Sequence, residues 1–284
     1  GDHVADANIA FFGDYAAGNF FTVPDGAPDP NGGTFIEEHG PVISAETQTV
    51  TSDPNTHVTT ISGLSVADAF DTNPNDVFSI TAVAGQGTLA PHGQTGTSDT
   101  LSFSGTLSDI NNALAEGVDY SPTLDGNNQP PAQDHVSLNI QDANGAIDEI
   151  NFVFNVAGQP DGSGNINLNG TSGKDVIYNT SAGSNPGGTT DTMTGGAGSD
   201  TFVFRNFSPQ TPHNDLVADF NLNQDFLNFD HTTFATISDV LAAAHADPNN
   251  AANTVITVDN HNTVTINNVT VADLTQHQNH ILVV

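Results

Sequence analysis

The chain has 284 residues, with 33 acidic residues against two basic ones and a formal net charge of -31 at pH 7. A charge of this size repels other polyanions, which excludes nucleic acid and anionic membrane surfaces as partners. There is no cysteine and no apolar run long enough to span a membrane, so disulfides, thiolate sites and membrane insertion are also excluded.

Most of the acidic residues are aspartates rather than glutamates. Aspartate forms turns and supplies oxygen ligands to metal ions, whereas a salt-adapted surface would use more glutamate, largely on helices. We therefore expect metal-binding loops, with a salt-adapted surface as the alternative.

Residues 1–40 do not follow a domain pattern. Two apolar patches, Ile9–Phe12 and Phe20–Val23, precede a stretch rich in Pro, Gly, Asn and Asp. Their aromatic side chains would be unfavourable in water, so they must dock against protein. We interpret residues 1–40 as an N-terminal extension that packs on its own chain or adds a strand to a neighbouring subunit.

Residues 41–158 contain short β-branched runs separated by turn clusters, the pattern of an immunoglobulin-like β-sandwich. One helix is expected over Asp109–Ala115, because Ile110 and Leu114 fall on one face. Ser108 would cap this helix and Gly117 would stop it. The expected strands are Thr47–Thr51, Val58–Ile61, Val77–Val83, Val136–Ile140 and Ile150–Val156.

This block resembles the cadherin-like, immunoglobulin-fold repeats of large secreted bacterial adhesins. The likeness is carried, in the order that the family shows, by segments 61–68, 87–89, 104–114, 118–122 and 142–145. Oxygen donors in its expected loops form a candidate second calcium region, with solvated turns as the alternative. These donors are Asp68 and Asp71 near Asp76, and Asp142 with Asn144 and Asp148.

A Gly/Pro-rich stretch at 158–164 predicts a boundary between two domains, 41–158 and 159–284. Beyond it, segment 195–203 matches every defined position of the nonapeptide G-G-x-G-x-D-x-U-x, in which U is a large apolar residue. The glycines permit a tight turn, Asp200 supplies a carboxylate to calcium, and Phe202 packs inside. Segments 186–194 and 170–178 are weaker copies. The candidate calcium ligands are Asp175, Asp191, Asp200, Gly173, Gly196 and Gly198.

These repeats resemble the calcium-binding repeats-in-toxin (RTX) family, which implies a short parallel β-roll and Ca²⁺ as the bound ion. The likeness continues through segments 215–220, 225–229, 253–256, 263–274 and 280–284, typical of an uncleaved C-terminal region for type I secretion. The resemblance implies a secreted or cell-surface location. A helix capped by Ser238 and running to about Ala246 is expected at the end of the roll.

Signatures of catalysis are missing from the sequence. No HExxH, GxSxG or phosphate-loop motif occurs, and the 11 histidines suit solvated or structural roles. We therefore expect a protein that is not an enzyme. One remaining function is a self-associating structural subunit of an extracellular matrix, surface layer or filament. The alternative is a calcium-dependent adhesin that binds cell-surface polysaccharide.

Overall fold

The computed structural model describes residues 20–24, 34–38, 40–45, 49–52, 56–69, 73–126, 131, 133–155, 165–180, 190–205, 207 and 213–284. Strands dominate this part of the chain, in sheets that mix parallel and antiparallel pairs, and three short α-helices accompany them. No helix in the described ranges is long and apolar enough to cross a membrane. The fold is mostly β, as the sequence predicts.

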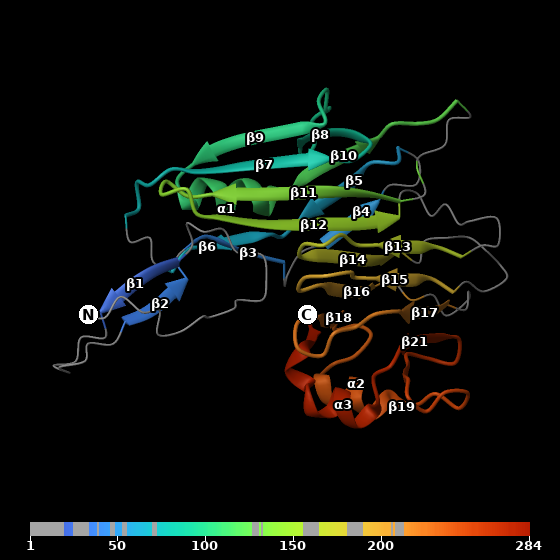
Figure 1. Cartoon of the computed structure of the whole chain (residues 1–284). Coiled ribbons are helices and arrows are strands. Elements are labelled where there is room, and N and C mark those ends of the chain that lie inside the picture. The colour runs from blue at the N-terminus through green and yellow to red at the C-terminus, as the bar shows by residue number, and fades with distance from the viewer. Residues whose placement is uncertain are drawn as a thin grey trace.

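One eight-stranded sheet runs through both halves of the molecule (Figure 1). Its order is β22 (Ile281–Val283), β18 (Phe226–Phe229), β16 (Thr201–Arg205), β14 (Asp175–Thr180), β12 (Ile147–Asn155), β11 (Gln133–Gln141), β7 (Phe78–Ala84) and β9 (Thr100–Gly105). From β9 to β12 the strands pair antiparallel. From β12 to β22 they pair parallel, so the pairing changes from antiparallel to parallel at β12.

A second, antiparallel sheet packs against the antiparallel half of the first. Its order is β4 (Thr49–Ser52), β5 (Thr59–Ser62), β10 (Val118–Pro122) and β8 (Gly87–Pro91). Every second residue of β7 is buried, which is the period of a strand with one face on a core. Side chains from both sheets form one buried cluster, which includes Ile61, Tyr120, Ile80, Leu138 and Phe152.

Part of the N-terminal extension forms an antiparallel pair of its own, β1 (Phe20–Pro24) with β2 (Thr34–Glu38). The patch Phe20–Val23 is therefore a strand, whereas Ile9–Phe12 lies outside the described residues. A further short pair joins β3 (Val42–Ser44) to β6 (Ser65–Ala67), and it contributes Ile43 and Val66 to the buried cluster.

The C-terminal half adds a six-stranded sheet. Its order is β13 (Asn167–Asn169), β15 (Thr192–Thr194), β17 (His213–Val217), β21 (Asn262–Ile266), β20 (Thr254–Thr257) and β19 (Ala244–Ala246). The first four strands pair parallel. Strands β13 to β18 alternate between this sheet and the eight-stranded one, so the chain coils and each coil adds one strand to each sheet.

Two buried clusters meet at the shared eight-stranded sheet. Val176, Tyr178 and Val203 belong to the first cluster, whereas their neighbours Ile177 and Phe202 belong to the second. Successive residues point into different cores because both faces of β14 and β16 are covered. The expected domain boundary lies at residues outside the described ranges. The two halves it would separate are joined by the parallel pairing of β12 with β14.

Helix α1 (Leu107–Glu116) buries Ile110 and Leu114, as expected, and ends at Gly117. Its cap is Thr106, however, and the expectation of Ser108 was wrong. The Thr106 hydroxyl accepts the N–H of Asp109, and the Asp109 carboxylate accepts the N–H of Thr106. This reciprocal capping box satisfies two backbone donors at once, which a cap two residues later would not.

Helix α2 (Ile237–Ala243) also begins earlier than expected, because Thr236 and Asp239 cap it instead of Ser238. It does not reach Ala246, since residues 244–246 form β19 and pair with β20. The helix therefore ends where the backbone of residues 244–246 pairs with the edge of the sheet. Helix α3 spans Val271–Gln276 and has a capping box of its own.

Candidate metal centre

Three turns of the coil stack in register where β14, β16 and β18 begin. Asp175, Asp200 and Asp225 occupy equivalent positions, 25 residues apart. The N–H of Asp175 donates to Asp200 Oδ1 at 3.0 Å, and the N–H of Asp200 donates to Asp225 Oδ1 at 3.0 Å. All three side chains are buried. We call these residues the aspartate ladder.

The 25-residue interval explains which segments build the ladder. Segments 170–178, 195–203 and 220–228 align, with aspartate at the sixth position and a buried apolar residue at the eighth. A step of nine residues leads from a strand of one sheet to a strand of the other, as from Asp191 to Asp200. Asp225 follows Asp200 by 25 residues, so the nine-residue register does not include it. The interval of 25 residues is present in the sequence, but the nine-residue register gives no reason to choose it.

The ladder is an unfavourable place for charged carboxylates. Burial, and after it the nearby carboxylates, raise the pKa of Asp200 to about 8. Burial also raises the pKa of Asp225. Asp200 Oδ2 is buried and has no hydrogen-bond partner within the described part of the chain. A buried carboxylate in this position requires either a proton or a cation.

The two basic side chains make their described contacts elsewhere. Lys174 Nζ lies 2.8 Å from Asp148 Oδ2, and Arg205 donates to Asn228 Oδ1 at 2.8 Å. His280 lowers the pKa of Asp225, but burial outweighs this effect. The pKa of Asp225 is thus raised despite His280, and a bound metal ion could balance the charge of the ladder carboxylates.

Glycines allow these turns to stack closely. Gly196 and Gly198 have φ values of 96° and 120°, in the left-handed region that other residues rarely adopt. A Cβ at Gly196 would lie 2.1 Å from Thr171 O, and one at Gly198 would lie 2.3 Å from Gly173 O. The three expected glycine ligands thus lie in adjacent turns beside the ladder.

Asp191 lies outside the ladder, at the other end of β15 from the turn that contains Asp200. Thr192 pairs with Leu216, which places Asp191 beside Asp215. Asp191, His213 and Asp215 each offer one ligand atom, and these atoms lie within 4.8 Å of one another. We call them the Asp-His cluster, and it too could hold a metal ion.

Burial determines the protonation of the Asp-His cluster. It raises the pKa of Asp191 to about 6 and that of Asp215 well above its usual value, and it lowers the pKa of His213. Sequence reasoning missed His213 and Asp215. The available signal was their spacing of two residues on a strand, which puts both on one face with Val217.

Two of the candidate ligands in the N-terminal half, Asp142 and Asp148, have other partners. Asp142 Oδ1 accepts the N–H groups of Asn144 and Ala146, at 2.9 and 2.7 Å, and so forms the turn between β11 and β12. Asp148 pairs with Lys174 and accepts the N–H of Ile43 at 2.7 Å. Asp68 follows β6, and Asp71 lies outside the described residues.

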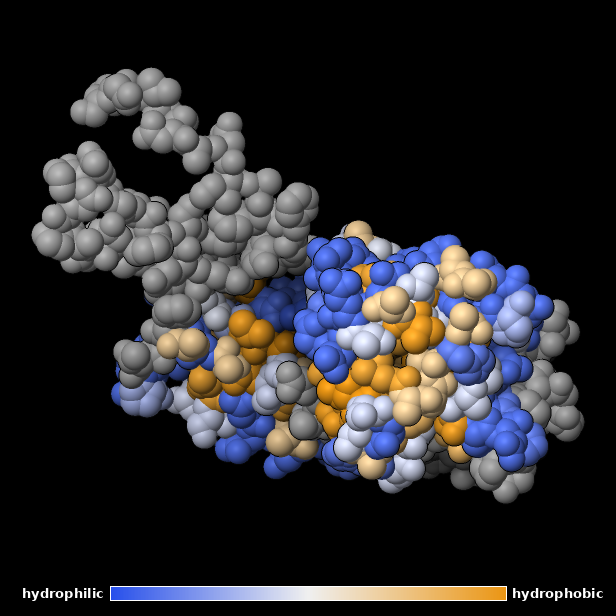
Figure 2. Space-filling view, turned by 90° about the horizontal axis from the view of Figure 1, so that it is seen from below, coloured by the Kyte–Doolittle hydropathy of each residue, from blue (hydrophilic) through white to orange (hydrophobic). Residues whose placement is uncertain are grey.

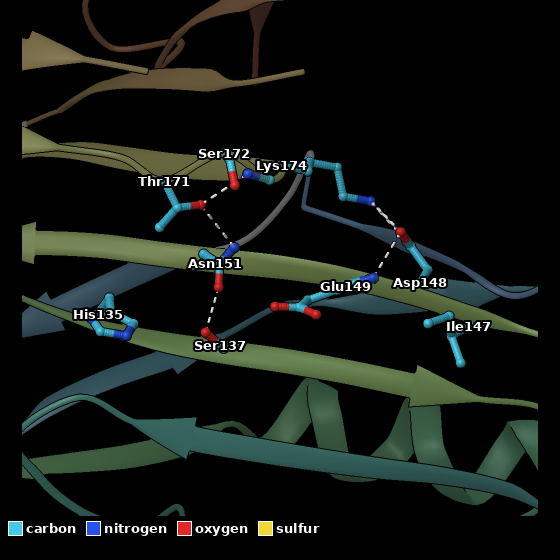
Figure 3. Close-up of a pocket in the computed structure, with 10 residues that line it drawn as sticks. His135, Ser137, Ile147, Asp148, Glu149, Asn151, Thr171, Ser172 and Lys174 are labelled. Atoms are coloured by element: carbon cyan, nitrogen blue, oxygen red, sulfur yellow. Dashed lines mark hydrogen bonds and ion pairs between the residues drawn. The ribbon is translucent and has the colours of Figure 1, made fainter. Parts of the chain in front are cut away.

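A polar pocket of about 540 Å³ lies where the antiparallel half meets the first coil (Figure 3). Asn151 is central to it, and pairs in register with Asp175. Its amide accepts from the Ser137 hydroxyl and donates to Thr171 Oγ1 at 3.5 Å. An uncharged amide therefore stands where the aspartate ladder would otherwise gain a further carboxylate.

No protein-family model matches this sequence, and a search of curated proteins finds no relative. The resemblances to RTX and cadherin-like proteins therefore rest on the motifs themselves. The structure contains two candidate metal sites, the aspartate ladder of buried carboxylates and the Asp-His cluster with its imidazole nitrogen.

Proposed function

We propose that this chain is a secreted, calcium-binding structural protein of a bacterial extracellular matrix, surface layer or filament. In this proposal the antiparallel half is an immunoglobulin-like β-sandwich, and the coiled half is a short RTX-like parallel β-roll. The observation that carries the proposal is the aspartate ladder, in which three buried carboxylates stack in register and Asp200 Oδ2 has no hydrogen-bond partner within the described part of the chain.

Calcium suits the ladder better than other common metal ions do. The donors available in the stacked turns are oxygen atoms of carboxylates and backbone carbonyls, the ligand type that Ca²⁺ prefers. Calcium accepts six to eight oxygen ligands in flexible geometry, whereas magnesium requires a near-ideal octahedron. Turns related by a strand spacing of about 4.8 Å supply such ligands from two levels.

Calcium binding would couple folding to the location of the protein. Without the ion, ladder carboxylates oppose folding unless they are protonated, so binding energy becomes folding energy. The chain would then remain unfolded in the low calcium of a cytosol and fold outside the cell. This behaviour is compatible with type I secretion.

Two surface features support self-association. Strands β22 and β9 are the outer strands of the eight-stranded sheet and offer edges for strand addition. A groove of about 330 Å³ beside β3 is lined mostly by apolar residues, among them Val42, Phe226 and Leu282, with Lys174 and three hydroxyl residues also in its lining. Figure 2 shows hydrophobic residues gathered on the face seen from below, with hydrophilic residues around them. Docking of a strand from the N-terminal extension on a neighbour would repeat without closing and build a filament.

The alternative function is that of a calcium-dependent adhesin that binds polysaccharide. The polar pocket favours it, because His135, Ser137, Glu149 and Asn151 offer hydrogen-bonding groups together on one side of the sheet (Figure 3). Hydroxyl, amide and carboxylate groups in a shallow pocket suit sugar hydroxyls. In neither proposal does the protein act as an enzyme.

The test measures folding and assembly as a function of calcium. Far-UV circular dichroism in chelator should show loss of native β content, which millimolar calcium restores. Light scattering of the folded chain should then show concentration-dependent polymers, and a variant lacking residues 1–36 should fold without assembling. A monomer that binds polysaccharide supports the adhesin. Full native structure in chelator would contradict the role of calcium in both functions.

A further inference from the structure

The Asp-His cluster differs in chemistry from the aspartate ladder. Its side chains are buried, with exposed fractions of 1% for Asp191, 3% for His213 and 0% for Asp215. It contains an imidazole nitrogen as well as two carboxylates, and its ligand atoms already lie within 4.8 Å of one another. Two carboxylates and one imidazole, enclosed together, form the kind of mixed N/O donor set found in transition-metal sites.

The fold holds these donors in place independently of any ion. His213 and Asp215 point inward from β17, whose burial alternates residue by residue. The N–H of Leu216 donates to Asp191 O at 2.7 Å, and Asp191 Oδ1 accepts the N–H of Ile166 at 3.2 Å. The N–H of His213 donates to Asn262 Oδ1 at 3.1 Å, which fixes β17 against β21. Backbone contacts to three neighbouring strands or turns therefore preorganise the cluster.

We propose that Asp191, His213 and Asp215 form a transition-metal centre that takes Zn²⁺ in preference to Ca²⁺. Zinc binds imidazole nitrogen and carboxylate oxygen at about 2.0 to 2.2 Å and needs four ligands. Calcium needs six to eight, nearly all oxygen. Two carboxylates neutralise the charge of the zinc ion, and neutral imidazole is the form that binds it.

The surroundings favour a low coordination number. The cluster lies beside the second hydrophobic core, in which Met193 of β15, Val217 of β17 and Val264 of β21 are completely buried. Apolar side chains supply no further ligands to an ion, which favours the lower coordination number of zinc over that of calcium. The cluster offers three of the four ligands that zinc needs, and a water molecule would take the fourth position.

This inference goes beyond the proposed function and assigns Asp191 an ion different from the calcium that its nonapeptide register predicts. The two sites lie at opposite ends of β15, so each can be altered without touching the other. A zinc ion here would link β15 to β17 and stabilise the coil at the end opposite to the calcium ladder.

The test uses the full chain, stripped of metal and kept in millimolar calcium so that the ladder is saturated. Titration with Zn²⁺ should show one tight site per chain. His213→Gln should weaken it by more than about 100-fold, since it removes a direct ligand rather than a supporting group. His261→Gln, at an exposed histidine, and Asp200→Asn, in the ladder, should leave zinc affinity unchanged.

The proposal is overturned if the unaltered protein binds no zinc in millimolar calcium, or if the His213→Gln and His261→Gln variants bind zinc with equal affinity. If His213→Gln fails to fold, X-ray absorption spectroscopy of the unaltered protein with one equivalent of zinc decides. The expected spectrum has one imidazole and otherwise oxygen ligands, and a shell without imidazole refutes the assignment. Because Asp200→Asn tests the ladder alone, failure of the calcium proposal and failure of the zinc proposal give different results.

Discussion

Replacing Asp200 by Asn should stabilise the metal-free protein and reduce its response to calcium. Asn keeps the shape and the Oδ1 acceptor for the N–H of Asp175, but it carries no charge. The pKa of Asp200 is raised from 3.8 to about 8 in the folded chain. At about pH 7.5 the unfolded chain ionises this carboxylate while the folded chain retains the proton, which costs up to about 5 kcal/mol of stability.

The sign of this effect makes it dependent on pH. A raised carboxyl pKa means that the folded state binds more protons, so stability falls as pH rises from about 4 to about 8. Below about pH 4 both states are protonated and the penalty disappears. The unaltered protein and Asp200→Asn should therefore be similar in stability near pH 4 and diverge towards pH 7.5.

Calcium should offset only part of the stability difference between the unaltered protein and Asp200→Asn. Extracellular calcium modules bind with dissociation constants of about 0.1 to 1 mM. Calcium at 10 to 100 times the dissociation constant adds roughly 1.4 to 2.7 kcal/mol per site. The unaltered protein should gain this free energy of unfolding for each ladder site, and Asp200→Asn should gain less.

The assay is urea unfolding followed by far-UV circular dichroism, in chelator and in saturating calcium, at both pH values. The matched control is Asp99→Asn, because Asp99 is exposed and its carboxylate accepts only the hydroxyls of Ser98 and Thr100 in the described contacts. If Asp200→Asn were no more stable than the unaltered protein in chelator at pH 7.5, the ladder would not be a site of buried charge. An undiminished calcium response would show instead that Asp200 is not a calcium ligand.

Two further substitutions and one control test close packing, first in the stacked turns and then in the core of the antiparallel half. Gly196→Ala should lower the free energy of unfolding by more than about 2 kcal/mol, because its φ is 96° and the new Cβ would meet Thr171 O. Gly93→Ala has φ of 78° with open space around the Cβ and should cost only about 1 kcal/mol, so equal losses in the two variants would contradict close stacking. Tyr120→Phe should cost about 1 to 3 kcal/mol in urea unfolding, because the buried hydroxyl donates to Asp134, and an unchanged midpoint would show that this bond is replaced.

Local signals in the sequence sufficed for much of the secondary structure. A β-branched run between turn clusters predicted the strand Val77–Val83, now β7, and the four-residue spacing of Ile110 and Leu114 predicted α1. These signals are local because strand and helix periods depend on backbone geometry alone. The caps were misassigned at Ser108 because several Ser and Thr residues compete near a helix start. The residue that caps the helix is the one followed by an aspartate three positions later, as Thr106 is by Asp109.

The nonapeptide likewise determined, by itself, that Asp200 lies in a tight glycine turn and that Phe202 is buried. Only the tertiary structure decided which carboxylates meet. The neighbours of Asp200 are Asp175 and Asp225, because coils of 25 residues bring those positions into register. The coil length depends on connecting segments whose span no nine-residue period reveals. His213 and Asp215 join Asp191 for the same reason, since parallel strands bring together residues distant in sequence only after the coil has closed.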